Sequence, residues 1–336
     1  MIDFAALKSS SRLLLNVPLQ PVQGDRFQPT GFADIGAAEY SRPDSEGKKG
    51  IPMLLVESAQ SVANRLEKSC LDGDGPGIDP ELTGLAYVTA KLDSGDAMRT
   101  LYTSSLIEAH RLASVYFIKT PFGPRLAEEM GYTQKGALDW KRIYKVLFKY
   151  DPNSLIHGVF LSLLHDGRVR VPRAVTGFIE ASNVKQVVSG GVKNSQIDPK
   201  GEIQIATEDG KTEKGVYSNV PYSRVEYVGN LMAYFNVDLS LIRSYGLCED
   251  ATDLLTTLAM LKIRRFLDGN LRLRTACDLE SKGALESRPK EFVLPSEGEL
   301  LPVVKALIVK CKSKFADPAV TVLDVKVAIK AKPETT

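Results

Sequence analysis

The chain has 336 residues, of which 43% are hydrophobic and 25% are charged, and its formal net charge at pH 7 is +2. A chain of this length and composition can bury a substantial core, in one large or two ordinary domains. The small net charge excludes a uniformly basic, histone-like protein, so any nucleic-acid surface must be local.

The first third of the sequence predicts a strand, a functional loop and a helix. Residues 12–19 are apolar and strand-like, and the glycine-containing stretch 20–40 is typical of a functional loop. Residues 54–68 have apolar side chains at helical spacing. The polar side of this helix carries two pairs four residues apart, Gln60 with Asn64 and Ser61 with Arg65. Such donors suit phosphate or sugar, although a solvated helix face is the commoner meaning.

Three further elements are predicted in the middle of the chain. Residues 103–105 open a helix in which Ser105 and Glu108 have the spacing of a capping box, with Arg111 following. Residues 137–150 form a basic amphipathic helix. The apolar run 155–164, flanked by His157 and His165, fits a buried strand, and a structural role for the histidines is favoured over a metal site.

Residues 183–222 have a different texture, with lysines, paired glycines and short alternating stretches. They predict a projecting β-arm that carries Lys185 and Lys193. Because the arm has few large apolar residues, we expect it to be ordered by a partner or by nucleic acid.

The most informative stretch is the strand 271–274, Leu-Arg-Leu-Arg, which follows a helix over 253–267 and a turn. Strict alternation puts Leu271 and Leu273 on one face and both arginines on the other. Guanidinium groups bind phosphate through a planar fork of donors, which suits a nucleic-acid backbone. Basic residues at the preceding helix end, Arg264 and Arg265, also offset the helix dipole. A helix over 300–312, a strand over 320–329 and a loose tail at 333–336 complete the chain.

Motifs of known chemistry are not found. The four cysteines form no C-x-x-C pair, and the sequence lacks a phosphate-binding loop, a nucleophile elbow, an H-E-x-x-H pair and a dinucleotide fingerprint. No metal, cofactor or enzymatic activity is therefore indicated, and an enzyme here would have to use carboxylates that the sequence alone does not pair. The sequence also shows no signal-like start and no membrane-spanning stretch, so we expect a cytoplasmic protein.

Four separated segments, in the same order, resemble the repeated backbone subunit of type I-G (formerly I-U) CRISPR interference complexes, a Csb-type member of the RAMP superfamily. They are residues 21–32 (PVQGDRFQPTGF), 55–67 (LVESAQSVANRLE), 103–112 (TSSLIEAHRL) and 265–278 (RFLDGNLRLRTACD). The resemblance covers most of the chain.

The resemblance implies an α+β fold over a single domain, residues 1–336. Its expected centre is an RRM-like (ferredoxin-like) palm of antiparallel strands backed by helices. A helical, finger-like insertion is expected within residues 54–150, and a projecting β-hairpin thumb is expected at residues 183–222.

The implied function is antiviral defence by RNA binding. Copies of the subunit would stack head to tail in a helical filament along a guide RNA within a Cascade-like complex, and would present the guide to a target DNA strand. Further partners would be other subunits of the effector complex and a recruited helicase-nuclease. Holding phosphates and 2′-hydroxyls while leaving base edges free would assign sequence specificity to the guide.

Donor chemistry within these segments and the arm supplies the candidate RNA contacts. They are Gln23, Arg26, Gln28, Thr30, Gln60, Asn64, Arg65, Arg111, Lys185, Lys193, Arg265, Arg272 and Arg274. Arg65 and Arg111 could equally form structural salt bridges with Glu67 or Glu108.

Two other classes of function remain open. Related backbone subunits cut bound RNA through a loop aspartate and a metal, and Asp34 would be the residue for a metal-dependent ribonuclease here. The second class is a small-molecule enzyme on an α+β scaffold, which failure to bind RNA at low salt would favour.

Overall fold

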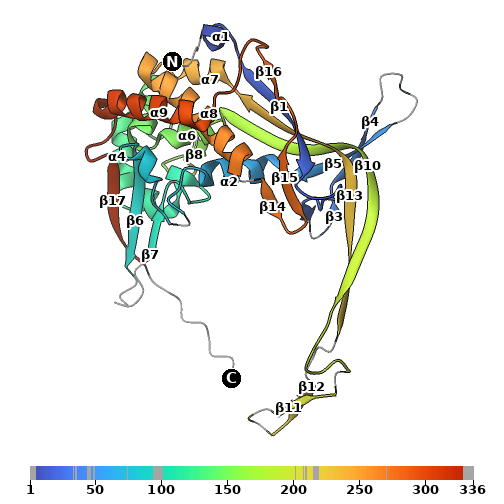
Figure 1. Ribbon diagram of the computed structural model, residues 1–336. Helices are drawn as coiled ribbons and strands as arrows, with labels where there is room; N and C mark the ends of the chain where they lie inside the picture. The colour runs from blue at the N-terminus through green and yellow to red at the C-terminus, as the bar shows by residue number, and fades with distance from the viewer. Residues whose placement is uncertain are drawn as a thin grey trace.

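The computed structural model describes residues 5–32, 34, 36–43, 47, 50–73, 75–93, 101–200, 202–206, 208, 210–214, 219–269 and 271–327. The predicted loose tail at 333–336 lies outside these residues. Within them the fold is mixed α+β, with antiparallel strand pairs predominating (Figure 1). No helix among these residues is both long and apolar enough to cross a membrane.

An eight-stranded sheet forms the centre, and every neighbouring pair in it is antiparallel. The strand order is β14-β15-β1-β13-β10-β5-β4, and β16 pairs with the first half of β1. The strands are β1 (Leu13–Pro21), β4 (Glu39–Arg42), β5 (Ile51–Glu57), β10 (Val175–Lys193), β13 (Val220–Val237), β14 (Arg272–Arg274), β15 (Cys277–Ser281) and β16 (Glu286–Arg288).

Two helices cover one face of this sheet. They are α2 (Ala59–Lys68), which lies on β10, and α8 (Glu249–Gly269), which lies on β13 and β15 (Figure 1). Gly177 on β10 permits the close approach of α2, because a Cβ there would lie 2.7 Å from the ring of Phe235 and 3.0 Å from a methyl group of Val62. Phe235 also packs edge-on against Phe266 of α8, with ring centroids 6.0 Å apart.

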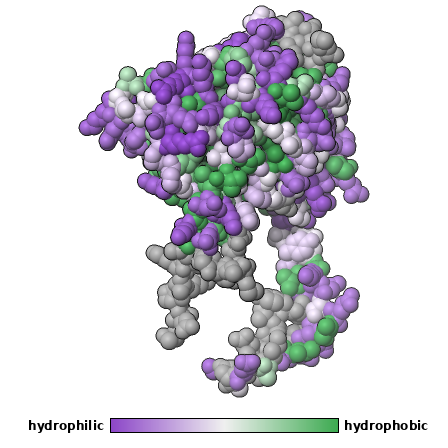
Figure 2. Space-filling view, turned by 90° about the vertical axis from the view of Figure 1, so that its left-hand side faces the viewer, coloured by the Kyte–Doolittle hydropathy of each residue, from purple (hydrophilic) through white to green (hydrophobic). Residues whose placement is uncertain are grey.

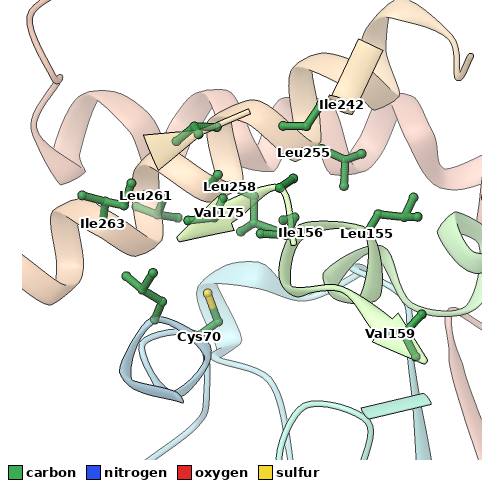
Figure 3. Packing of buried hydrophobic residues seen from close by; sticks show 14 of the residues in the cluster. Cys70, Leu155, Ile156, Val159, Val175, Ile242, Leu255, Leu258, Leu261 and Ile263 are labelled. Atoms are coloured by element: carbon green, nitrogen blue, oxygen red, sulfur yellow. The ribbon is translucent and has the colours of Figure 1, made fainter. Parts of the chain in front are cut away.

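Helix α8 is enclosed on most of its circumference because further helices cover it. They are α6 (Pro152–His157), α7 (Leu239–Ser244) and α9 (Glu297–Cys311). Lys8 of the short helix α1 (Ala5–Lys8) pairs with Glu249 at the start of α8. Figure 3 shows Leu255, Leu258 and Leu261 of α8 packed among side chains from α6, α7 and β10. The side chain of Lys262 on α8 is also buried there: it is 1% exposed, and its Nζ donates to Oδ1 of Asn153 at 2.7 Å.

A second layer of structure lies beside the helices. The three-stranded sheet β17-β6-β7 pairs β17 parallel to β6 and β7 antiparallel to β6. Its strands are β6 (Tyr87–Asp93), β7 (Leu101–Ser104) and β17 (Val320–Lys326). The remaining elements here are α3 (Val115–Ile118), α4 (Phe122–Met130), α5 (Trp140–Tyr150), the pair β8 (Val159–Phe160) and β9 (Arg170–Val171), and 3-10 turns at Pro80–Leu82, Arg111–Ala113 and Lys312–Lys314.

A long hairpin leaves the central sheet (Figure 1). Strands β10 and β13 stay paired from the sheet out to Lys193 and Val220, with a bulge between Ser182 and Lys185. The pair β11 (Gln204–Ala206) and β12 (Thr212–Lys214) lies at its far end. We call residues 185–193 with 220–228 the arm, and they lie within or beside the predicted segment 183–222.

Three sequence predictions of local structure were wrong. Residues 54–57 are strand β5, and α2 begins only at Ala59 behind the cap Ser58, because β5 is held between β10 and β4. Residues 103–105 open no helix; β7 runs to Ser104, and Glu108 accepts hydrogen bonds from Thr103 and Ser114 in place of forming a capping box.

The third wrong prediction is the strand over 155–164. Residues 155–157 belong to α6, which Asp151 caps by accepting from the backbone N–H of Asn153 at 3.1 Å. Gly158, with φ 79°, ends the helix, and only Val159–Phe160 is extended. The predicted strand at 12–19, the amphipathic helix at 137–150 and the helix at 300–312 are confirmed within a few residues.

Candidate nucleic-acid interface

Two of the four segments that carry the family resemblance, 55–67 and 265–278, meet at Glu57. This residue ends β5, and its side chain is 1% exposed. Its Oε1 accepts from Nε of Arg65 on α2 at 2.9 Å, and its Oε2 accepts from Nη2 of Arg274 on β14. The hydroxyl of Ser61, one turn before Arg65, also donates to Oε1. One buried carboxylate therefore holds two arginines from distant parts of the sequence.

Backbone carbonyls fix the same two arginines further. Nη2 of Arg65 donates to the carbonyl of Leu273 at 2.6 Å, and Nη1 of Arg274 donates to the carbonyl of Gln28 at 3.0 Å. Each guanidinium has five N–H groups, so these contacts leave others over. Both side chains are about a quarter exposed, at 25% and 24%. Desolvation by burial lowers the pKa of both from its ordinary value, and both remain cations at neutral pH.

The neighbouring residue Cys277 is 1% exposed, so the inner side of this cluster is shielded from solvent. Burial raises the pKa of Cys277 to about 11, although the guanidiniums of Arg274 and Arg65 act in the opposite direction. The thiol therefore stays protonated at neutral pH. The two arginines thus have a dry inner side and a partly exposed outer side.

A polar row continues along α2. Nε2 of Gln60 donates to Oδ1 of Asn64 at 2.9 Å, and Gln60 accepts from Nη2 of Arg173. Gln60 and Asn64 are exposed, so the structure places both predicted donors on the surface. Arg173 was missed, because it precedes β10 by two residues and no pattern in the sequence marks it.

The loop from Gln23 to Gly31 runs beside this cluster. Its backbone is fixed, since the N–H of Gln28 donates to Ala276 at 2.8 Å and that of Thr30 donates to Val56 at 3.0 Å. Gln23 and Arg26 are exposed, while Gln28 and Thr30 are half-buried. A pocket of about 390 Å³ lies between Gln28–Gly31, Gly36–Ala37 and three residues at the base of the arm, namely Gln186, Val225 and Tyr227.

The alternation predicted for residues 271–274 is confirmed. Leu271 and Leu273 are buried, at 4% and 7% exposure, and the two arginines point to the other face. The arginines are not equivalent, however, because Arg272 is exposed whereas Arg274 is held by Glu57. The two arginines on this face are therefore one fixed guanidinium, Arg274, and one exposed guanidinium, Arg272.

Two of the predicted contact residues are enclosed by carboxylates. Arg111 donates to both oxygens of Glu67, with Nη2 at 2.8 Å, and to the carbonyl of Gly158 at 3.2 Å. Arg265 lies 2.6 Å from Asp79 and 2.7 Å from Glu297, and its side chain is 11% exposed. The geometry favours a structural role for both arginines. For Arg111 this role is the salt bridge with Glu67 that the sequence left open as an alternative.

The arm has two unlike faces. Lys185 and Lys193 are exposed on the face that also carries Tyr222 and Arg224, whose guanidinium lies 5.9 Å from the tyrosine ring centroid. Across the base of the arm, Arg26 and Arg224 each lie 3.5 Å from Glu226. The opposite face carries Val188, paired with Val225, and Val192, paired with Pro221. Val188 is 74% exposed and Val192 is 54% exposed.

Among the described residues, no group of three or more His, Cys, Asp or Glu side chains is placed to hold a metal ion. Asp34, the aspartate considered for a ribonuclease, is exposed. His157 is fully buried and His165 stacks edge-on with Tyr132, with ring centroids 5.2 Å apart.

Comparison with known proteins assigns a family. The chain belongs to the family of the CRISPR-associated protein GSU0053, whose family model matches residues 13–186, just over half of the sequence. The predicted membership of a CRISPR-associated RAMP-type family is thereby confirmed. No curated protein matches the chain.

Among solved structures, a chain of a "CRISPR RNA-guided surveillance complex, pre-nicking" is similar to this one. The two have 14% sequence identity and a TM-score of 0.42, and the match covers 90% of this chain and 86% of the other.

Proposed function

We propose that this protein is a non-catalytic backbone subunit that oligomerises along CRISPR guide RNA in a type I-G, Cascade-like effector complex, and that it presents the guide for pairing with target DNA. Membership of a CRISPR-associated family supports the setting. The proposed partners are guide RNA, target DNA, further copies of this chain, other subunits of the complex and a recruited helicase-nuclease.

One structural observation carries this proposal: partly exposed, rigidly held arginines lie close to the base of a long arm. Arg274 donates to the backbone carbonyl of Gln28. Gln28 in turn lines a pocket together with Val225 and Tyr227 at the base of the arm. Fixed guanidiniums suit phosphates, which recur along an RNA strand whatever its sequence. The polar row on α2 and the exposed Arg272 extend the same donor surface.

The sheet topology supports an RRM-like palm. Four of its strands have the order β15-β1-β13-β10, in which β10 and β13 form a hairpin inserted between β1 and β15 in the chain. The helices α2 and α8, which precede β10 and β15 respectively, lie on one face. This strand order and helix placement agree with those of a split β-α-β fold and so support the proposed palm.

The arm supports assembly into a filament. A two-stranded hairpin with both faces in solvent is only marginally stable by itself, so its two unlike faces suit two different partners. We assign the face with Lys193, Arg224 and Tyr222 to nucleic acid, and the face with Val188 and Val192 to a neighbouring copy. A head-to-tail contact of this kind does not close, so other subunits would cap the ends.

A length series of RNAs tests the proposal. The full-length protein is mixed with single-stranded RNAs of increasing length at low salt, and the mass of each complex is measured. We expect the number of bound copies to rise in proportion to RNA length, with affinity falling as salt increases. A protein that remains monomeric and does not bind RNA at low salt would contradict the proposal and favour a small-molecule function.

A further inference from the structure

We infer that Glu57 is a positioning residue of the RNA surface: its buried carboxylate sets the spacing and direction of Arg65 and Arg274 so that their outer N–H groups meet backbone phosphates. This inference rests on the proposed function, since it concerns how the same surface recognises the phosphodiester chain of a single-stranded RNA. No pattern in the sequence pointed to Glu57.

The geometry distinguishes Glu57 from an ordinary ion-pair partner. Its two oxygens are divided between two guanidiniums, one on α2 and one on β14. Each guanidinium has a second anchor, the carbonyl of Leu273 or of Gln28. A planar group held at two points has a fixed orientation, so little rotamer freedom remains to be lost when a phosphate binds.

A comparison with a second paired carboxylate, Glu67, shows the difference. Glu67 on α2 also pairs with an arginine, but that pair is enclosed, with side-chain exposures of 14% for Glu67 and 11% for Arg111. Around Glu57 the carboxylate is buried at 1% while its arginines keep about a quarter of their surface. The acid faces the protein and the cations face solvent, as phosphate binding requires.

The charges of the cluster make the inference testable. Two guanidiniums and one carboxylate carry a net charge of +1. If only charge mattered, removing the carboxylate would raise the affinity for RNA, because a negative charge would disappear from the surface. If Glu57 positions the arginines, removing its charge lowers the affinity, because the guanidiniums lose their common acceptor and turn away.

The experiment compares Glu57→Gln with the wild-type, full-length protein in RNA binding over a range of salt concentrations. We expect Glu57→Gln to bind RNA about tenfold more weakly, the size of about one charge-assisted hydrogen bond. Glu67→Gln, which removes a carboxylate that pairs with the enclosed Arg111, serves as the matched control and should leave the affinity unchanged. Thermal unfolding of each variant measures how much stability is lost.

A second measurement separates positioning from general stability. In an Arg65→Ala/Arg274→Ala background, Glu57→Gln should have no further effect on RNA affinity, because the groups it positions are absent. A merely structural Glu57 would lower the affinity in both backgrounds. Should Glu57→Gln fail to fold, Arg65→Lys gives the same test without loss of charge, since an ammonium cannot reach Glu57 and Leu273 in the same way. We expect Arg65→Lys to weaken binding severalfold more than Arg272→Lys does.

The inference is overturned if Glu57→Gln binds RNA as tightly as wild type or more tightly. It is also overturned if Arg65→Lys and Arg272→Lys weaken binding equally. Either result leaves the proposed function intact. Failure of the wild-type protein to bind RNA at low salt would defeat the proposed function itself. The two failures are therefore distinguishable.

Discussion

Nζ of Lys262 lies 2.9 Å from Nε2 of His157 inside the core, where the two side chains are 1% and 0% exposed. Burial, the Lys262 ammonium and the nearby guanidinium of Arg111 together hold the pKa of His157 well below 6.5. The imidazole is therefore neutral in the folded protein, and Nε2 accepts from the ammonium. The same network contains Asp151, whose pKa burial raises to about 6.

The low pKa of His157 predicts a loss of stability at mildly acidic pH. Below about pH 6.5 the unfolded chain protonates this histidine and the folded protein does not, so the free energy of unfolding falls as pH falls. Asp151 acts in the opposite direction below about pH 6, because its folded form takes up a proton first. In His157→Gln only the histidine contribution is removed, so the stability advantage of wild type over this variant should shrink by about 2 kcal/mol between pH 7.5 and pH 5. Urea denaturation at both pH values measures it, and parallel pH dependence in the two proteins would contradict this account.

Arg272 and Arg274 are predicted to contribute to RNA affinity. The double variant Arg272→Ala/Arg274→Ala should bind RNA more weakly, and the slope of log affinity against log salt should fall by about one for each lost phosphate contact. Lys305→Ala/Lys310→Ala removes the same charge from exposed positions of α9, where both lysines pair with carboxylates. Equal losses in the two double variants would mean that general charge, rather than this surface, governs binding.

The contact between α2 and β10 predicts a specific stability effect. Gly177→Ala places a methyl group 2.7 Å from Phe235 and 3.0 Å from the backbone carbonyl of Tyr234, so we expect a destabilisation of about 1–3 kcal/mol by overpacking. Gly298→Ala on α9 meets nothing within 4 Å and should be neutral or slightly stabilising. Chemical denaturation of both variants measures the difference in their free energies of unfolding. No difference would mean that α2 and the neighbouring side chains move away freely and that Gly177 is not needed for their close approach.

The apolar face of the arm is predicted to serve assembly rather than stability. Because Val188 and Val192 are largely exposed, Val188→Ser/Val192→Ser should leave the free energy of unfolding within about 0.5 kcal/mol of wild type. The number of copies bound per RNA should nevertheless fall. Val293→Ser/Val309→Ser changes two valines of similar exposure, 77% and 72%, away from the arm, and serves as control. Normal assembly of the arm variant would remove the arm from the copy-to-copy contact.

Asp34 is predicted to have no part in cleavage. Guide and target RNA incubated with the protein and Mg²⁺ or Mn²⁺ should stay intact, and Asp34→Ala should behave as wild type. Loss of target RNA that requires metal and is abolished by Asp34→Ala would establish the ribonuclease alternative instead.

Much of the fold followed from local patterns in the sequence. Alternation correctly predicted that the side chains of Leu271 and Leu273 are buried. The apolar stretch 12–19 corresponds to β1. In both cases the local pattern agrees with the packing around it. Residues 54–57 did not follow, since a short apolar run fits a strand or a helix and only its pairing with β10 and β4 decides.

The candidate site was predictable in its segments but not in its contacts. Arg65 and Arg274 were identified as donors, yet their common acceptor Glu57 lies 217 positions before Arg274 in the sequence. A glutamate at the end of a strand is usually exposed, and no local signal indicates that two guanidiniums will enclose it. Arg265 was likewise selected for its charge, whereas its partners Asp79 and Glu297 come from distant segments.

The most direct test of the central claim is co-purification. The protein is expressed with a CRISPR array and the other subunits of its complex, and the purified material is examined by its absorbance ratio at 260 and 280 nm and by sizing the bound nucleic acid. We predict a large assembly that contains RNA of one discrete guide length. A clean monomer without nucleic acid would contradict the claim that this chain is the backbone of a guide-RNA complex.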